Sequence, residues 1–330
     1  MRTRKSIIIL IGFIALAIVL SVMPFVLSGY LLSVLVLLLI YMLPAMSMRV
    51  SLLTGQTNIG VVAFFAIGGY ASAILSMELG VPVVIALLAG GLIAAIVGLL
   101  LGSMIMKMGD LYFLILTWGF LELVRSVAIK AVPLTNGPFG LVNIPPISIG
   151  GLVLSDVPEY FFILFVLVLV LVLLYRMEYS RLGLTWKGIA QAPDLSESVG
   201  VNVYRYKLVS FIISCFVAGL GGALYAHHMG VLQPVMFTFL LATTVILWNV
   251  LGGVGSYWGP IVGTVFLLLI VEPLRGLASF EMITYASILI VVIILLPGGL
   301  VTLPSRLGFL IKRLRRKDKT AEADVESGGV

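Results

Sequence analysis

"EYFFILFVLVLVLVLLY", residues 159–175, carries one charged side chain, at its first position, and is otherwise apolar or aromatic. A helix rises about 1.5 Å per residue, so such a run and its neighbours can cross the core of a bilayer. Similar runs recur along the chain, whose 330 residues are 61% hydrophobic and 10% charged. Soluble domains are about 45–50% apolar and about 25% charged. The sequence therefore predicts an all-α polytopic membrane protein.

The apolar runs predict about ten transmembrane helices. We place these at 7–28, 30–48, 59–77, 82–106, 111–130, 159–175, 208–228, 238–251, 259–277 and 282–300. The third and eighth are short and flanked by polar residues, so either is a candidate for a broken or re-entrant helix. Two longer connections, an outer loop at 131–158 and an inner loop at 176–207, separate two sets of five spans. Because five is odd, a duplication between the halves would be an inverted repeat, as in many transporters.

Basic residues set the predicted orientation of these spans. With the N-terminus in the cytoplasm, nearly all of the 20 Lys and Arg residues fall on the cytoplasmic side, as the positive-inside rule requires. The tail then also lies inside, so both termini are expected in the cytoplasm. We predict one transmembrane domain over residues 1–304, followed by a tail, 305–330, that is basic and then disordered.

The sequence excludes several chemistries. It contains no G-x-x-x-x-G-K-[ST] motif, so ATP is not expected to bind this chain through a P-loop. His227 and His228 have no Cys or carboxylate at ligand spacing, which argues against a metal site. Cys215 is the single cysteine and is expected to pack inside a helix. No nucleophile and base pair up in the sequence, so we expect neither an enzyme nor a bound cofactor.

Two polar groups within apolar segments attract attention. Gln56 and Asn58 lie beside Gly55 and Gly60 where a span begins, and two interpretations fit equally: a broken helix that lines a pore, or a polar helix cap.

Glycines at 98 and 102, at 259 and 263, and within 218–226 have the spacing of closely packed membrane helices.

Glu122 and Arg125 form the second polar group, inside the fifth span. They are three residues apart and share a helix face. A charge inside a membrane is unfavourable, so we expect the pair to face the interior of the helix bundle. Whether it lines a transport pathway or serves as a structural ion pair stays open.

The inner loop contains the most polar internal stretch, residues 186–207. Pro193 suits the first turn of a helix and Gly200 suits the position after its end. Asp194 and Glu197 fall near the positive end of that helix. Apolar residues recur at helical spacing in two stripes: Leu182, Trp186 and Ile189, then Leu195 and Val199. We expect two short amphipathic helices at the cytoplasmic face, which either rest on the interface or dock a cytoplasmic partner.

The order of these motifs resembles the permease subunits of branched-chain amino-acid ABC importers, in particular their M-type permeases, over nearly the whole chain. The loop matches at Glu197, at Gly200-Val201-Asn202-Val203 and at Arg205-Tyr206-Lys207. The segments Leu134–Leu141 and Phe237–Thr264 resemble the family's outer loop and its glycine-rich segment, and Glu122 stands where the family commonly has a glutamate. Two segments depart: Asn58–Val61 lacks the family's histidine, and Ala190–Pro193 lacks its charges.

The resemblance implies a non-catalytic permease in a prokaryotic inner (cytoplasmic) membrane. Its implied partners are a sister permease, two cytoplasmic ABC ATPases and an extracytoplasmic solute-binding protein that delivers branched-chain or related hydrophobic amino acids. The implied coupling residues are Trp186, Ile189, Asp194, Leu195, Glu197 and Gly200. The candidates for lining the pore are Gln56, Asn58, Glu122, Arg125 and Asn136. Alternatives are a permease for urea or short amides, and a stand-alone ion-coupled transporter.

Overall fold

The structure is a computed structural model that describes residues 23–25, 29–274 and 299–302. Two compact units, Met1–Thr243 and Thr244–Val330, are described separately. The predicted spans 7–28 and 282–300 and the tail 305–330 lie outside the described residues, except for short pieces at 23–25 and 299–300.

Among the described residues of the first unit, six helices are long and apolar enough to cross a membrane. They are α2 (Gly29–Leu52), α3 (Val61–Glu78), α4 (Val83–Ile105), α5 (Asp110–Lys130), α7 (Asp156–Glu178) and α10 (Val203–Met229). They confirm six of the predicted spans and the multi-pass, helical class. The third span is one continuous helix of 18 residues. The total of about ten spans and the inverted repeat stay predictions.

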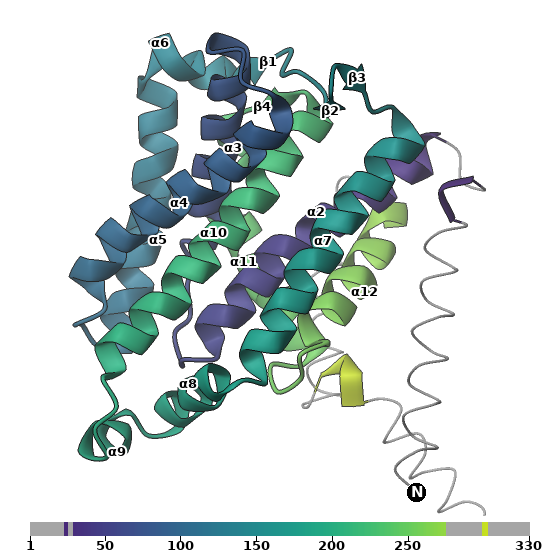
Figure 1. Ribbon diagram of the computed structural model, residues 1–330. Coiled ribbons are helices and arrows are strands. Elements are labelled where there is room, and N and C mark those ends of the chain that lie inside the picture. Colours follow the sequence, from purple (N-terminus) through teal and green to yellow (C-terminus); the bar gives the residue numbers. More distant parts are fainter. Residues whose placement is uncertain (1–22, 26–28, 275–298, 303–330) are drawn as a thin grey trace, which may run out of the picture. The chain divides into compact units, whose positions relative to one another are not determined.

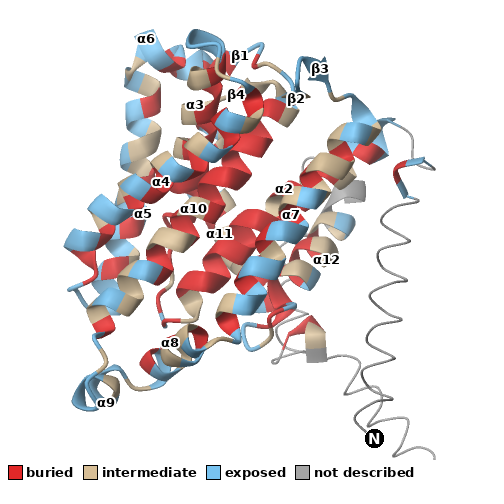
Figure 2. Ribbon diagram, viewed as in Figure 1, coloured by how far each residue is buried: buried red, intermediate tan, exposed pale blue. Residues whose placement is uncertain are grey.

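Helix α10 lies at the centre of the first unit, where it packs against α2, α3 and α4, while α7 packs on α2 and α5 on α3 (Figure 1). Buried residues gather along α2, α3 and α10 (Figure 2). Small residues permit this packing: a Cβ on Gly68 would overlap the backbone of Gly219, and one on Gly222 would overlap the Phe65 carbonyl. Gly98 lies against Cys215 in the same way. The predicted close packing of these helices is confirmed.

The connection from α5 to α7 contains short elements that the all-α prediction did not include. They are α6 (Val132–Thr135), η1 (Gly137–Phe139), β1 (Leu141–Val142), β2 (Ser148–Ile149) and β3 (Leu152–Val153). β2 pairs with β3, and β1 pairs antiparallel with β4 (Val231–Leu232), which follows α10 and precedes η2 (Pro234–Met236). Proline and glycine prevent a long helix here, so the backbone groups find partners in neighbouring segments.

The two histidines, in the last turn of α10, contact other elements at this end of the bundle. His227 Nδ1 lies 2.7 Å from the Pro145 carbonyl oxygen and its Nε2 lies 2.9 Å from Ser72 Oγ. His228 Nδ1 lies 2.9 Å from Glu159 Oε1 at the start of α7. Both rings thus connect α10 to other elements of the unit.

The second unit contains most of α11 (Phe239–Gly252), which begins in the first unit, together with α12 (Gly259–Leu274) and η4 (Leu300–Thr302). Both long helices are shorter than the spans of the first unit. Gly263 lies against the Trp248 carbonyl, as the spacing of Gly259 and Gly263 predicts.

Candidate functional site: the loop between α7 and α10

The loop between α7 and α10 folds into two short helices, α8 (Arg181–Gln191) and α9 (Pro193–Ser198), as the sequence predicts. Pro193 is the first residue of α9, and Gly200 follows its end with a φ of +88° that favours glycine. Asn202 then caps α10, because its side-chain oxygen accepts a hydrogen bond from the Arg205 backbone N–H at 3.0 Å. The Gly200–Val203 motif therefore ends one helix and starts the next.

Helix α8 rests against the bundle through its apolar stripe. Trp186 and Ile189 are each only 1% exposed. The indole Nε1 of Trp186 donates a hydrogen bond to the Tyr206 carbonyl oxygen at 3.0 Å. Ala190 lies so close to the turn after α2 that a Cβ on Gly55 would be 3.4 Å from its Cα. These contacts attach α8 to α10 and to the α2–α3 connection.

Helix α9 differs, because its apolar stripe is exposed in the part of the chain that the structure describes. Leu195 is 66% exposed and Val199, directly after the helix, is 72% exposed. Asp194 and Glu197 are also exposed. In Figure 2, α9 accordingly appears almost entirely in the colour of exposed residues. α9 thus offers a surface of mixed apolar and acidic character.

An ion triad with a buried carboxylate, Glu178, joins α8 to α7 and α2, and its Lys187 side chain is 38% exposed. Arg49, at the end of α2, binds Glu178, the last residue of α7, through two hydrogen bonds: Nε to Oε2 at 2.9 Å and NH2 to Oε1 at 2.7 Å. Lys187 of α8 adds an ion pair to the same Oε1 at 3.0 Å. The Arg49 and Glu178 side chains are only 4% and 3% exposed. Two cations thus share one desolvated carboxylate.

This triad was not predicted from the sequence. Arg49 and Lys187 contributed to the predicted orientation of the spans only as basic charges, and Glu178 was not singled out. A signal was present, because Glu178 is the one carboxylate among Arg176, Arg181 and Lys187 at a strongly basic helix end. Arg49 lies 129 residues away from Glu178, so no local pattern could identify it as the partner.

The connection between α2 and α3 buries polar side chains beside α8. Gln56 is 2% exposed and its Nε2 lies 3.1 Å from Met106 Sδ. Asn58 is equally buried, and neither atom of its amide has a hydrogen-bond partner within the part of the chain that the structure describes. A buried polar group without a partner costs about 1–3 kcal/mol. Such a group is therefore a candidate for binding something else.

The three other pore candidates lie elsewhere. Glu122 and Arg125 form the expected ion pair at 2.7 Å, but their side chains are 38% and 36% exposed. The expectation that they face the interior of this chain's bundle is wrong, because α5 buries little of its surface and packs mainly on α3. Asn136 is exposed and ends α6 with a φ of 58°, at the end of the unit away from α8. Their roles in a pathway stay predictions.

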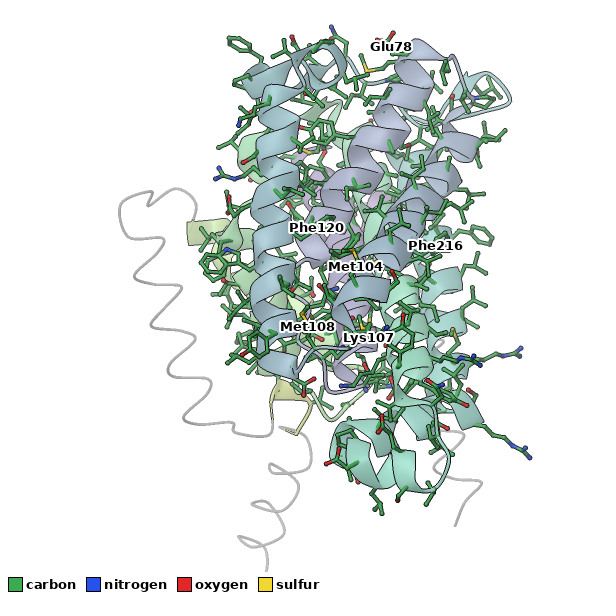
Figure 3. All side chains as sticks on the ribbon, turned by 90° about the vertical axis from the view of Figure 1, so that its left-hand side faces the viewer. Glu78, Met104, Lys107, Met108, Phe120 and Phe216 are labelled. Carbon is green, nitrogen blue, oxygen red and sulfur yellow. The ribbon has the colours of Figure 1, made fainter. Side chains whose placement is uncertain are left out.

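The two ends of the first unit differ in charge. Figure 3 shows Glu78 at one end of the helices and Lys107 near the other, where α8 and α9 lie. Arg49, Lys187 and Lys207 also belong to the α8 end. Lys207 forms an ion pair with Asp110 at 3.2 Å, which connects the starts of α10 and α5. This separation agrees with the charge asymmetry in the sequence.

Comparisons with known proteins identify the family. Two permease proteins of the high-affinity branched-chain amino acid transport system of Escherichia coli strain K12 are similar to the chain. LivM is 29% identical over 87% of this chain and 73% of its own length, and LivH is 27% identical over 39% of this chain and 42% of its own. A nucleoside ABC transporter permease of Lactococcus lactis, NupC, matches over a shorter stretch, 32% identical over 16% of this chain and 17% of its own.

No solved structure matches the chain. The family described as branched-chain amino acid transport system / permease component matches residues 30–297, which cover the long helices described above except for Gly29, the first residue of α2. Members of this family are membrane permease subunits and not enzymes. The chain therefore belongs to the permease components of branched-chain amino acid transport systems.

Proposed function

We propose that this chain is one of two permease subunits of an ATP-driven importer for branched-chain or related hydrophobic amino acids. The second permease is a homologous sister chain. Two cytoplasmic ABC ATPases supply the energy, and an extracytoplasmic binding protein delivers the solute. The α8 end faces the cytoplasm of a prokaryotic cell, and both termini lie on that side, because basic residues gather there.

The observation that carries this proposal, besides the family match, is the exposed stripe on α9. A short helix with exposed Leu195 and Glu197 at a membrane surface suits a protein partner, since apolar anchors with a polar surround are typical of interfaces. Its neighbour α8 is fixed to the bundle through Trp186 and Ile189. When the ATPases close on ATP, a force on α9 is thereby passed to the helices.

Asn58 and Gln56 are the pathway residues that the structure favours. Both are buried at the α8 end of α3, and the amide of Asn58 lacks a partner among the described residues. If the pathway opens at this point, the amide gains a polar solute or water as a partner. The solute-binding protein selects the substrate, so the pathway itself needs few specific groups.

Transport into vesicles tests the proposal. The whole importer, reconstituted with its ATPases and binding protein, should take up radiolabelled leucine, isoleucine or valine only when ATP is supplied to the side that bears the ATPases. Replacing Glu197 or Gly200 should abolish co-purification of the ATPases while the permease stays folded and inserted. Uptake that persists without ATP and without ATPases would favour an ion-coupled transporter instead.

Competition decides the substrate class. Unlabelled branched-chain amino acids should suppress the uptake of labelled leucine, whereas urea, acetamide and a nucleoside such as uridine should not. The nucleoside is included because one relative, matched over a short stretch, is a nucleoside permease. Suppression by urea or uridine alone would reassign the substrate but leave the permease role intact.

A further inference from the structure

We propose that the Arg49–Glu178–Lys187 triad transmits the movement of α8 to α2 and to the α2–α3 connection, which makes Lys187 and Glu178 positioning residues of the transport cycle. The proposal rests on the proposed function, since it assumes that α9 receives the force of the ATPases. It concerns a different part of the loop, because neither residue belongs to the exposed surface of α9.

The triad connects Lys187 of α8 to a buried, doubly hydrogen-bonded pair on α2 and α7. Arg49 holds Glu178 through two parallel hydrogen bonds, a fixed arrangement that a single contact would not give. Lys187 Nζ approaches the same carboxylate from α8 and also lies 5.0 Å from the centre of the Tyr179 ring. Because Arg49 and Glu178 are excluded from water, their attraction is screened less than that of a surface pair. A displacement of α8 therefore either stretches the contact of Lys187, whose side chain is 38% exposed and flexible, or moves Glu178.

A second contact of α8 also involves the connection between α2 and α3. Ala190, one turn after Lys187 on α8, touches the turn at Gly55, three residues after the end of α2. Arg49 lies in the last turn of α2. The ionic contact thus acts on the last turn of α2, directly before the segment 53–60, and the steric contact acts within that segment.

Within the described residues, unsatisfied polar groups in and beside that segment favour a second arrangement of it. It contains Asn58, whose buried amide has no partner among the described residues, and it begins beside Ser51, whose hydroxyl oxygen is in the same situation. Buried polar groups are normally satisfied, so exceptions of this kind require an explanation. A second position of the segment, reached when α8 moves, would give these groups partners.

Two lysines permit a matched experiment. Lys187 and Lys207 both lie at the α8 end and both pair with a carboxylate of another helix, but only Lys187 belongs to α8. Lys187→Met keeps the apolar stem, removes the charge and leaves the Arg49–Glu178 pair in place. Lys207→Met is the control, and Lys187→Arg keeps the positive charge at position 187.

The complete importer is reconstituted in vesicles, and uptake of a mixture of radiolabelled leucine, isoleucine and valine is measured together with phosphate release. In Lys187→Met, the amount of amino acid taken up per ATP hydrolysed should fall about five-fold or more, the lower end of typical coupling between sites. Hydrolysis and co-purification of the ATPases should persist. Lys187→Arg and Lys207→Met should resemble the wild type.

A second readout is independent of the transported solute. Deuterium exchange of the backbone at 53–60 should change when ATP is added to the wild-type complex and should not change in Lys187→Met. Equal uptake per ATP in Lys187→Met and wild type would overturn the proposal. Loss of ATPase co-purification in Lys187→Met alone would also overturn it, because Lys187 would then be a docking residue. Uptake by the wild type without ATPases would instead refute the proposed function.

Discussion

The two helices of one loop, α8 and α9, have similar amphipathic sequences but opposite surroundings. α8 buries Trp186 and Ile189 and carries a lysine that pairs with the buried Glu178, whereas α9 leaves Leu195 and Val199 exposed. On α8 the apolar stripe attaches the loop to its own chain. On α9 the stripe is exposed, and we propose that the ATPase binds there. Substitutions in the two helices should accordingly give different defects.

The largest effect is expected where the attachment is buried and charged. Glu178→Gln leaves Arg49 without its carboxylate in a desolvated position, and breaking such a pair costs about 3–5 kcal/mol. The matched change Glu122→Gln removes a half-exposed pair and should cost about 1 kcal/mol or less. Denaturant titration of the purified chain in detergent measures both free energies of unfolding. Equal losses in the two variants would contradict the distinction between the pairs.

Two aliphatic residues compare the helices directly. Ile189→Ala on α8 opens a cavity at a buried position and should lower the free energy of unfolding by about 2–5 kcal/mol. Leu195→Ala on α9 trims an exposed side chain and should stay within about 0.5 kcal/mol of the wild type. The same titration applies. A larger loss of stability in Leu195→Ala than in Ile189→Ala would contradict the difference in burial between α8 and α9.

For binding of the ATPase subunits, the substitution on α9 should have the larger effect and the substitution on α8 the smaller one. Leu195→Ala should raise the Kd for the ATPase subunits about ten-fold, which corresponds to a loss of about 1.4 kcal/mol at an interface anchor. The more conservative Ile189→Val should change it little, because its side chain faces the bundle. Binding of the permease to an immobilised ATPase, in detergent, gives both constants. An unchanged Kd for Leu195→Ala would remove α9 from the interface.

A smaller effect is expected at the junction between α9 and α10. Asn202→Ala removes the side-chain oxygen that accepts from the Arg205 N–H, and loss of such a cap costs about 1 kcal/mol. Asn202→Ser keeps an acceptor and should retain most of the stability. Thermal unfolding of both variants checks this, and a neutral Asn202→Ala would show that the cap contributes nothing.

The sequence could predict what depends on local pattern. Apolar runs indicated the long helices, and Pro193 and Gly200 marked the limits of α9. The charge asymmetry and the close packing at Gly98 also followed from sequence alone.

Features that depend on distant contacts could not be predicted. The pairing of Leu141 with Leu232 and that of Arg49 with Glu178 join residues far apart in the chain, so helix periodicity contains no information about them. The predicted orientation of Glu122 and Arg125, toward the interior of the bundle, was wrong for a related reason. The spacing of two residues on one helix face predicts that their charges pair. Whether that face is buried or exposed depends on the neighbouring helices.

Cross-linking from α9 tests the central claim most directly. Cys215 is buried, so a cysteine introduced at the exposed Ser198 can be labelled selectively with a photoactivatable maleimide. In the assembled importer, the label on Ser198→Cys should form a covalent adduct with an ATPase subunit, whereas a label on Leu152→Cys, exposed at the other end, should not. An adduct from Leu152→Cys, or none from Ser198→Cys in an importer that hydrolyses ATP, would contradict the assignment of α9 as the helix that receives the ATPase.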